Sequence, residues 1–264
     1  MRGTEPVYDD LGNGAAILLL HGFPFNRSMW REQVDFLRGA GYRIIAPDLR
    51  GLGTNQASAD ITTMDEMARD VLTLMDERKI ERGVVCGLSM GAYVALEMVS
   101  LFPSRVGALV LAGARAQGPD EAEKKSREQK ARLVLAEGMT GLADEMLPQL
   151  LAARTLAEKP DVVARVREMI RNTNPRGAAA AQRGMAARRD YSDGLHEIGA
   201  PTLIIAGRDD AIRTANDAEL IHNRIRKSRL ETIDDAGHLM NLEQPMIFNR
   251  ALLGFLTSNL ILKT

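Results

Sequence analysis

Residues 83–91 read Gly-Val-Val-Cys-Gly-Leu-Ser-Met-Gly. The first four form a short apolar run, typical of a strand buried on both faces, and a helical pattern of small and apolar residues follows over 90–101. Between strand and helix lies the pattern Gly-x-Ser-x-Gly, in which Gly87 and Gly91 flank Ser89. A serine on such a sharp turn needs a strained backbone, and the glycines let strand and helix approach closely. The stretch therefore predicts that Ser89 projects from the strand end toward a bound ligand.

Similar apolar runs recur along the chain and alternate with helical patterns. The expected strands cover residues 15–20, 42–46, 83–86, 106–112, 202–206 and 229–233. The expected helices cover residues 61–75, 90–101, 215–225 and 244–260, and Thr62 or Thr63 is the expected cap of the first. This alternation predicts an α/β fold, with a mostly parallel sheet and helices on both faces. Such sheets bind ligands at the carboxyl ends of their strands, and Ser89 follows one of those ends.

The alternation stops between residues 115 and 196. That stretch is rich in Ala, Leu, Met and Glu and has helix-spaced apolar residues, but it has no strand pattern. We therefore predict a core made of residues 1–114 and 197–264, with a helical insertion at 115–196.

A serine hydroxyl is a poor nucleophile unless a base accepts its proton. His238 lies between the last expected strand and the last expected helix, and it is the predicted base. The base needs a carboxylate to hold its tautomer and stabilise its charged form. Asp210 comes soon after the strand at 202–206 and completes the chain order Ser, Asp, His, while Asp209 remains the alternative acid.

Attack on a carbonyl places negative charge on its oxygen, which two backbone N–H groups usually stabilise. The residue after the nucleophile, Met90, is the expected first donor. Phe23 is the expected second donor, because the loop His21-Gly22-Phe23-Pro24 follows the strand at 15–20. In this interpretation His21 supports the loop and does not transfer protons.

Composition and charge exclude several classes. The 264 residues carry a net charge of −1 without single-sign runs, so nucleic acid is not an expected partner. No apolar stretch is long enough to predict a membrane span or a signal peptide, and the single Cys86 cannot form an internal disulfide. We therefore expect a cytoplasmic protein. No metal-ligand or nucleotide motif is present, so we expect no metal and no cofactor. The sequence leaves open whether the chain is a monomer or a homodimer.

The chain resembles the α/β-hydrolase superfamily over nearly its whole length. The resemblance is closest to small carboxylesterases, 3-oxoadipate enol-lactonases and cofactor-free haloperoxidase-like hydrolases. It is carried by residues 21–24, 48–51, 87–92, 184–190, 201–210 and 237–238. It implies that residues 115–196 form a cap over an active site. Ala92 departs from the pattern, since many members have a third glycine there. Ser89 argues against haloalkane dehalogenases, which use an aspartate nucleophile.

The predicted function is hydrolysis of small to medium carboxylic esters through an acyl-serine intermediate. The expected substrate-binding residues are Phe23, Met90, Met139, Met146 and Met185. An enol-lactonase acting on a dicarboxylate lactone is the first alternative. It would require a basic residue in the pocket, for which Arg115 and Arg188 are candidates. A perhydrolase is also open. The alternative of another class is a catalytically weak ligand receptor on the same scaffold. The sequence does not identify the natural ester or lactone.

Overall fold

The computed structural model describes residues 7–55 and 59–259. Within them lies a seven-stranded sheet with the strand order β1-β3-β2-β4-β5-β6-β7. The strands are β1 Tyr8–Leu11, β2 Ala16–Leu20, β3 Arg43–Pro47, β4 Gly83–Leu88, β5 Val106–Ala112, β6 Thr202–Gly207 and β7 Ser228–Ile233. All neighbouring pairs are parallel except β1 and β3, which are antiparallel. The predicted α/β class with a mostly parallel sheet is confirmed.

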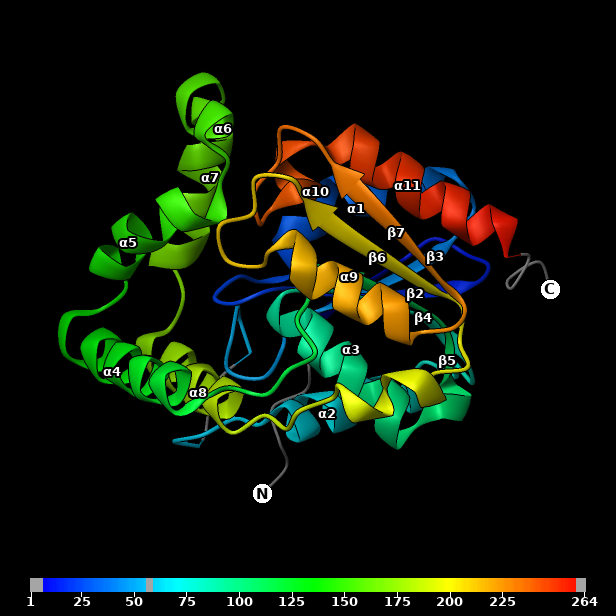
Figure 1. Cartoon of the computed structure of the whole chain (residues 1–264), viewed down its shortest axis with the longest axis horizontal. Helices are drawn as coiled ribbons and strands as arrows, with labels where there is room; N and C mark the ends of the chain where they lie inside the picture. The colour runs from blue at the N-terminus through cyan, green and yellow to red at the C-terminus, as the bar shows by residue number, and fades with distance from the viewer. Residues whose placement is uncertain (1–6, 56–58, 260–264) are drawn as a thin grey trace.

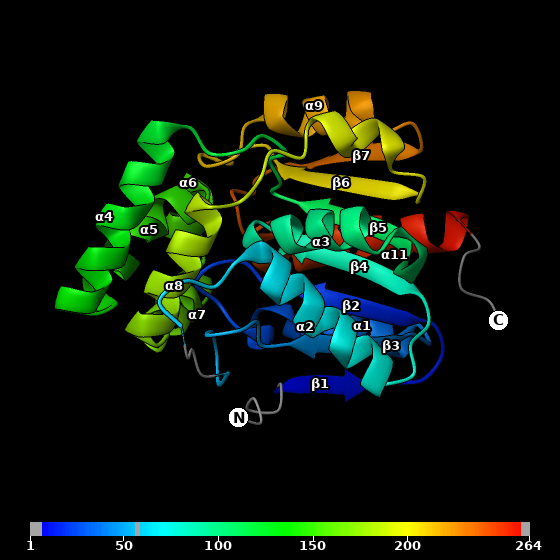
Figure 2. The same cartoon turned by 90° about the horizontal axis from the view of Figure 1, so that it is seen from below.

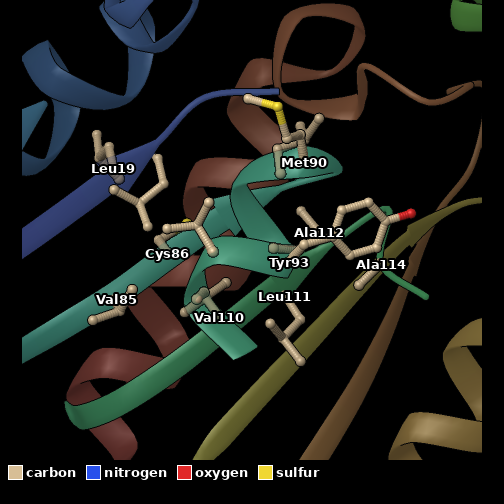
Figure 3. Packing of buried hydrophobic residues seen from close by; sticks show 14 of the residues in the cluster. Leu19, Val85, Cys86, Met90, Tyr93, Val110, Leu111, Ala112 and Ala114 are labelled. Atoms are coloured by element: carbon tan, nitrogen blue, oxygen red, sulfur yellow. The ribbon is translucent and has the colours of Figure 1, made fainter. Parts of the chain in front are cut away.

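The central strands are buried along their whole length. Every residue of β2, β4, β5 and β6 is buried, as expected for parallel strands covered on both faces. Figure 3 shows Leu19, Cys86 and Val110 from three of these strands packed close to the start of the helix that carries Met90 and Tyr93. The apolar runs that predicted these strands are therefore the core of the molecule.

Helices cover both faces of this sheet. In Figure 1, α1 and α11 lie above the sheet, while α2 and α3 lie below it. The helices of the core are α1 Arg31–Gly39, α2 Met64–Glu77, α3 Met90–Leu101, α9 Ala215–Arg224, α10 Met240–Glu243 and α11 Pro245–Ser258, with short 3-10 turns at Arg27–Trp30 and Pro103–Arg105. Thr63 caps α2 and forms a capping box with Glu66. Of the two predicted candidates, Thr63 is therefore the observed cap.

Three features of the core differ from the predictions. Strand β1 was not predicted, because its sequence Tyr-Asp-Asp-Leu has no apolar run and it pairs on one side only, at the sheet edge. Helix α1 was also not predicted. The helix expected over 244–260 begins at Pro245, directly after the separate turn α10, and Leu260 lies outside the described residues.

Five helices lie between β5 and β6 and are called the inserted helices below. They are α4 Glu121–Glu137, α5 Thr140–Leu150, α6 Ala153–Glu158, α7 Pro160–Arg171 and α8 Pro175–Ala186. A 3-10 turn at Asp193–Glu197 precedes β6. Figures 1 and 2 show the inserted helices gathered at one end of the sheet, on the left in both views. The division into core and cap domains stays a prediction. In the described part of the chain, no helix has the length and apolar character needed to cross a membrane.

Candidate active site

Ser89 sits on a strained turn between β4 and α3. Its φ is +55° and its ψ is −111°, a backbone conformation that residues with a side chain rarely adopt. The Ser89 N–H donates to the Ala112 carbonyl at 2.9 Å, which ties the turn to β5. A Cβ added at Gly87 would lie 2.1 Å from the Gly91 carbonyl oxygen, and one added at Gly91 would lie 2.1 Å from the Leu20 oxygen. Both glycines are therefore required by the close approach of strand and helix, as the sequence predicts.

A buried histidine–carboxylate pair lies in the loops that follow β7 and β6. His238 Nδ1 is 2.7 Å from Asp210 Oδ2, and both side chains are almost completely shielded from solvent. The other carboxylate oxygen of Asp210 accepts the N–H groups of Ile212 and Arg213 at 2.8 and 2.9 Å. These donors fix the orientation of the carboxylate toward the imidazole. Asp209, the alternative acid, is exposed, so the structure brings Asp210 and not Asp209 to His238.

The loop that carries His238 is attached to the inserted helices by a second carboxylate. Glu243 is fully buried, and its two oxygens accept the N–H groups of Gly237 and Ala152, both at 2.8 Å. The His238 N–H donates to the Leu150 carbonyl at 2.9 Å. Burial raises the pKa of the Glu243 carboxyl, although its N–H donors oppose the rise. Glu243 was missed by sequence reasoning, and its only signal is an acidic residue five positions after the histidine.

Gly113 is a second position that sequence reasoning missed. It follows β5 with a φ of +54°. A Cβ added there would lie 3.0 Å from His238 Cε1 and 3.7 Å from Asp210 Oδ2. A side chain at this position would therefore push against the buried pair.

Two backbone amides near Ser89 have no acceptor. Within the described residues, neither the Phe23 N–H nor the Met90 N–H donates a hydrogen bond to the protein. The Phe23 loop is held by His21, whose Nδ1 lies 2.9 Å from the Gly22 oxygen and whose Nε2 accepts the Leu49 N–H at 2.9 Å. Burial lowers the pKa of His21, and these contacts fit one neutral tautomer. The expected supporting position of His21 agrees with these contacts.

Ser89 and His238 line one cavity of about 350 Å³ between the core and the inserted helices. Phe23, Met146 and Met185 also line it, whereas Met90 and Met139 are buried side chains that do not. The remaining lining residues are Tyr93, Arg115, Asp120, Glu123, Ser126, Arg127, Lys130, Gln149, Leu150, Gln182, Ile212 and Arg213. The Ser89 hydroxyl makes no hydrogen bond with another described residue. The hydrogen bond between a nucleophile and its base is often long in a ligand-free site and shortens when substrate binds. The cavity is therefore where a ligand would meet both side chains.

Comparison with known proteins agrees with this geometry. The model of the alpha/beta hydrolase fold matches residues 15–245. The chain belongs to the α/β-hydrolase family. A thermophilic esterase from Thermogutta terrifontis, solved with malate bound, is 37% identical, with a TM-score of 0.94 over 96% of this chain and 93% of the esterase.

Enol-lactonases are also among the α/β-hydrolases similar to this chain. The enol-lactonase structure from Burkholderia xenovorans is 30% identical, with a TM-score of 0.89 and 96% of each chain covered. 3-Oxoadipate enol-lactonase 1 of Acinetobacter baylyi is 30% identical over 246 residues, which cover 93% of this chain and 90% of the relative. The predicted resemblance to the superfamily is confirmed, and the chain is a hydrolase.

The cavity of this α/β-hydrolase has a strongly charged wall on its inserted side. Glu123 accepts hydrogen bonds from Arg127 at 2.7 Å and from Arg188 at 3.0 Å, and Arg115 lies 3.6 Å from it. Burial opposes ionisation of Glu123, but hydrogen bonds from Arg188 and Arg127 outweigh it and lower the pKa to about 2. Of the two basic residues considered for an enol-lactonase, Arg115 lines the cavity. Arg188 is buried, with its guanidinium 4.4 Å from the centre of the Tyr93 ring.

Proposed function

We propose that the chain is a serine hydrolase that cleaves small carboxylic esters or lactones through an acyl-serine intermediate. The observation that carries the proposal is that His238, in contact with the buried Asp210, lines one cavity together with Ser89 on its strained turn. Family membership alone would not support this chemistry, because one fold hosts many reactions.

In the proposed reaction, the Ser89 oxygen attacks the carbonyl carbon while His238 Nε2 takes the serine proton. Asp210 stabilises the imidazolium through the Nδ1 contact. The unpaired N–H groups of Phe23 and Met90 are the candidate donors to the oxyanion. His238 then gives its proton to the departing alkoxide. Water attacks the acyl-serine with His238 again as base, which releases the acid and restores Ser89.

The inserted helices are the proposed cap of this site. They supply Met146 and Met185 to the cavity wall, and the Leu150 carbonyl at the end of α5 accepts the His238 N–H. A wall of this kind limits the size of the acyl or alcohol group that fits beside Ser89.

A lactone substrate is the second candidate. The observation that favours it is Arg115 in the cavity wall, because an enol-lactonase would require a basic residue in its pocket. Similarity to two enol-lactonases agrees with this candidate. The same residues would open a lactone ring, with the alkoxide leaving group remaining attached to the acyl chain.

The test compares 4-nitrophenyl esters of increasing acyl length with five- and six-membered lactones. We expect Ser89→Ala to lower kcat on every accepted substrate by about 10⁴-fold or more. Ser100→Ala, at the exposed far end of α3, is the matched control and should leave kcat unchanged. Tight ligand binding with no turnover by the wild-type protein would contradict the proposal and favour a receptor.

A further inference from the structure

Arg213 is a basic residue of the cavity wall, and no described residue is its acidic partner. Its Nη2 donates to the Tyr93 hydroxyl at 2.6 Å and its Nη1 to the Ile212 carbonyl at 3.1 Å. Its Nε is buried and has no hydrogen-bond partner. Across residues 7–55 and 59–259, no carboxylate oxygen lies within 4.0 Å of its guanidinium nitrogens. Among the described residues, only neutral oxygens therefore balance the charge of Arg213 at hydrogen-bond distance, while the carboxylates of Glu123 and Asp217 act on it from farther away.

The carboxylates nearby are engaged with other groups. Glu123 is shared by Arg115, Arg127 and Arg188. Asp217 accepts the Thr214 N–H at 3.0 Å and lies 3.8 Å from Arg115. They are therefore occupied by partners other than Arg213.

More basic than acidic residues line the cavity. Its basic residues are Arg115, Arg127, Lys130 and Arg213, and its acidic residues are Asp120 and Glu123. Asp120 caps α4 by accepting the Glu123 N–H. Lys130 pairs at 2.9 Å with Glu145, which does not line the cavity. This leaves Arg213 as the cavity cation with no acidic partner among the described residues.

Arg213 is also attached to the catalytic machinery at two points. Its backbone N–H donates to Asp210, and its guanidinium reaches Tyr93, one turn after Ser89 on α3. Figure 3 shows the Tyr93 hydroxyl at the edge of the labelled core residues, beyond Ala112 and Ala114. A group held by Arg213 would therefore share the cavity with the bond to be cleaved.

A guanidinium in a partly dehydrated site binds carboxylate more strongly than it binds neutral oxygen acceptors, because its planar fork matches the two carboxylate oxygens. We propose that Arg213 forms an anion-binding subsite, so that the preferred substrate is a small ester or lactone carrying a carboxylate. The inference rests on the proposed function, and it adds a substrate class that the triad by itself does not specify.

Two esters of equal carbon count test the subsite. Methyl hydrogen glutarate carries a carboxylate where methyl pentanoate carries a methyl group. The wild type should cleave the anionic ester with the higher kcat/KM. Arg213→Gln should lower that value about tenfold to a hundredfold, mainly through KM, and change the neutral ester less than about threefold. Arg213→Lys should keep part of the preference, since it retains the charge but not the fork.

Arg132→Gln is the matched control, because it removes the same charge from an exposed position on α4. It should leave the ratio between the two esters unchanged. An equal loss on both esters in Arg213→Gln would overturn the subsite and make Arg213 a support for the triad. An equal kcat/KM of the wild type on both esters would also overturn it.

Calorimetric binding of glutarate to Ser89→Ala separates this inference from the proposed function. Glutarate should bind to Ser89→Ala, and it should bind more weakly when Arg213→Gln is added to that variant. This result would support the subsite even if the wild type cleaved no ester. Absence of glutarate binding, together with normal cleavage of neutral esters, would overturn the subsite while the proposed function stands.

Discussion

The loops after the strands and the inserted helices contribute to one cavity, but their side chains are held in different ways. On the strand side, backbone groups fix the geometry: Ser89 has an unusual φ, and Asp210 accepts two N–H groups from its own loop. On the inserted side, ion pairs between side chains fix it, with three arginines around Glu123. The comparison shows that backbone groups hold the candidate catalytic residues, whereas ion pairs between side chains hold the charged wall opposite them.

The largest effect is expected when the proposed catalytic acid on the strand side, Asp210, loses its negative charge. Asp210→Asn should lower kcat by about 10⁴-fold, because an amide no longer stabilises the imidazolium or fixes the required tautomer. Asp209→Asn is the matched control and should remain close to wild type, since Asp209 is exposed. Ester kinetics of both variants measure the difference. A large loss in Asp209→Asn with a small loss in Asp210→Asn would reverse the assignment of the acid.

The next effect concerns Glu243, which connects the loop of His238 to the inserted side. Glu243→Gln leaves one buried N–H, at Gly237 or Ala152, without a carboxylate oxygen. We expect about 1–3 kcal/mol less stability in urea unfolding and a kcat about 10- to 100-fold lower through displacement of His238. Glu219→Gln, exposed on α9, is the control. A stability loss without a change in kcat would mean that Glu243 supports the fold but not the position of His238.

A smaller effect concerns the ion pairs of the inserted side. The pKa of Glu123 is about 2 in the folded protein, against an ordinary value of 4.5. A lowered folded pKa gives stability that is complete above pH 4.5 and is lost as the pH falls toward 2. The melting temperature of wild type should therefore fall in this window, and that of Glu123→Gln should fall less steeply. Glu121→Gln, whose carboxylate is exposed, should keep the wild-type slope.

The smallest effect concerns the apolar part of the cavity wall. Met146→Ala should enlarge the cavity and move the preferred acyl chain one or two carbons longer, with changes in kcat/KM below about tenfold. Met246→Ala, exposed on α11, should leave the acyl-length profile unchanged. An unaltered profile in Met146→Ala would show that the acyl chain does not reach this wall.

Much of the fold could be predicted from the sequence, because apolar runs encode buried parallel strands directly. The Ser89 turn was also predictable, since Gly87 and Gly91 are required within five residues of chain. The pairing of His238 with Asp210 followed from their positions after strands, and the structure places the two in contact.

Features set by contacts between distant segments could not be predicted. Strand β1 is short and polar and is defined by its pairing with β3. Glu243 and Arg213 look like ordinary charged residues in the sequence. Their importance appears only in the structure, where Glu243 is buried between two loops and Arg213 has no acidic partner within residues 7–55 and 59–259.

The central claim is that Ser89 is an activated nucleophile, and covalent labelling tests it most directly. A fluorophosphonate probe reacts with a serine hydroxyl that a neighbouring base deprotonates. We predict one adduct per chain, located by peptide mass spectrometry at Ser89, and no adduct in Ser89→Ala. Labelling of the wild type at another residue, or labelling that survives in Ser89→Ala, would contradict the account.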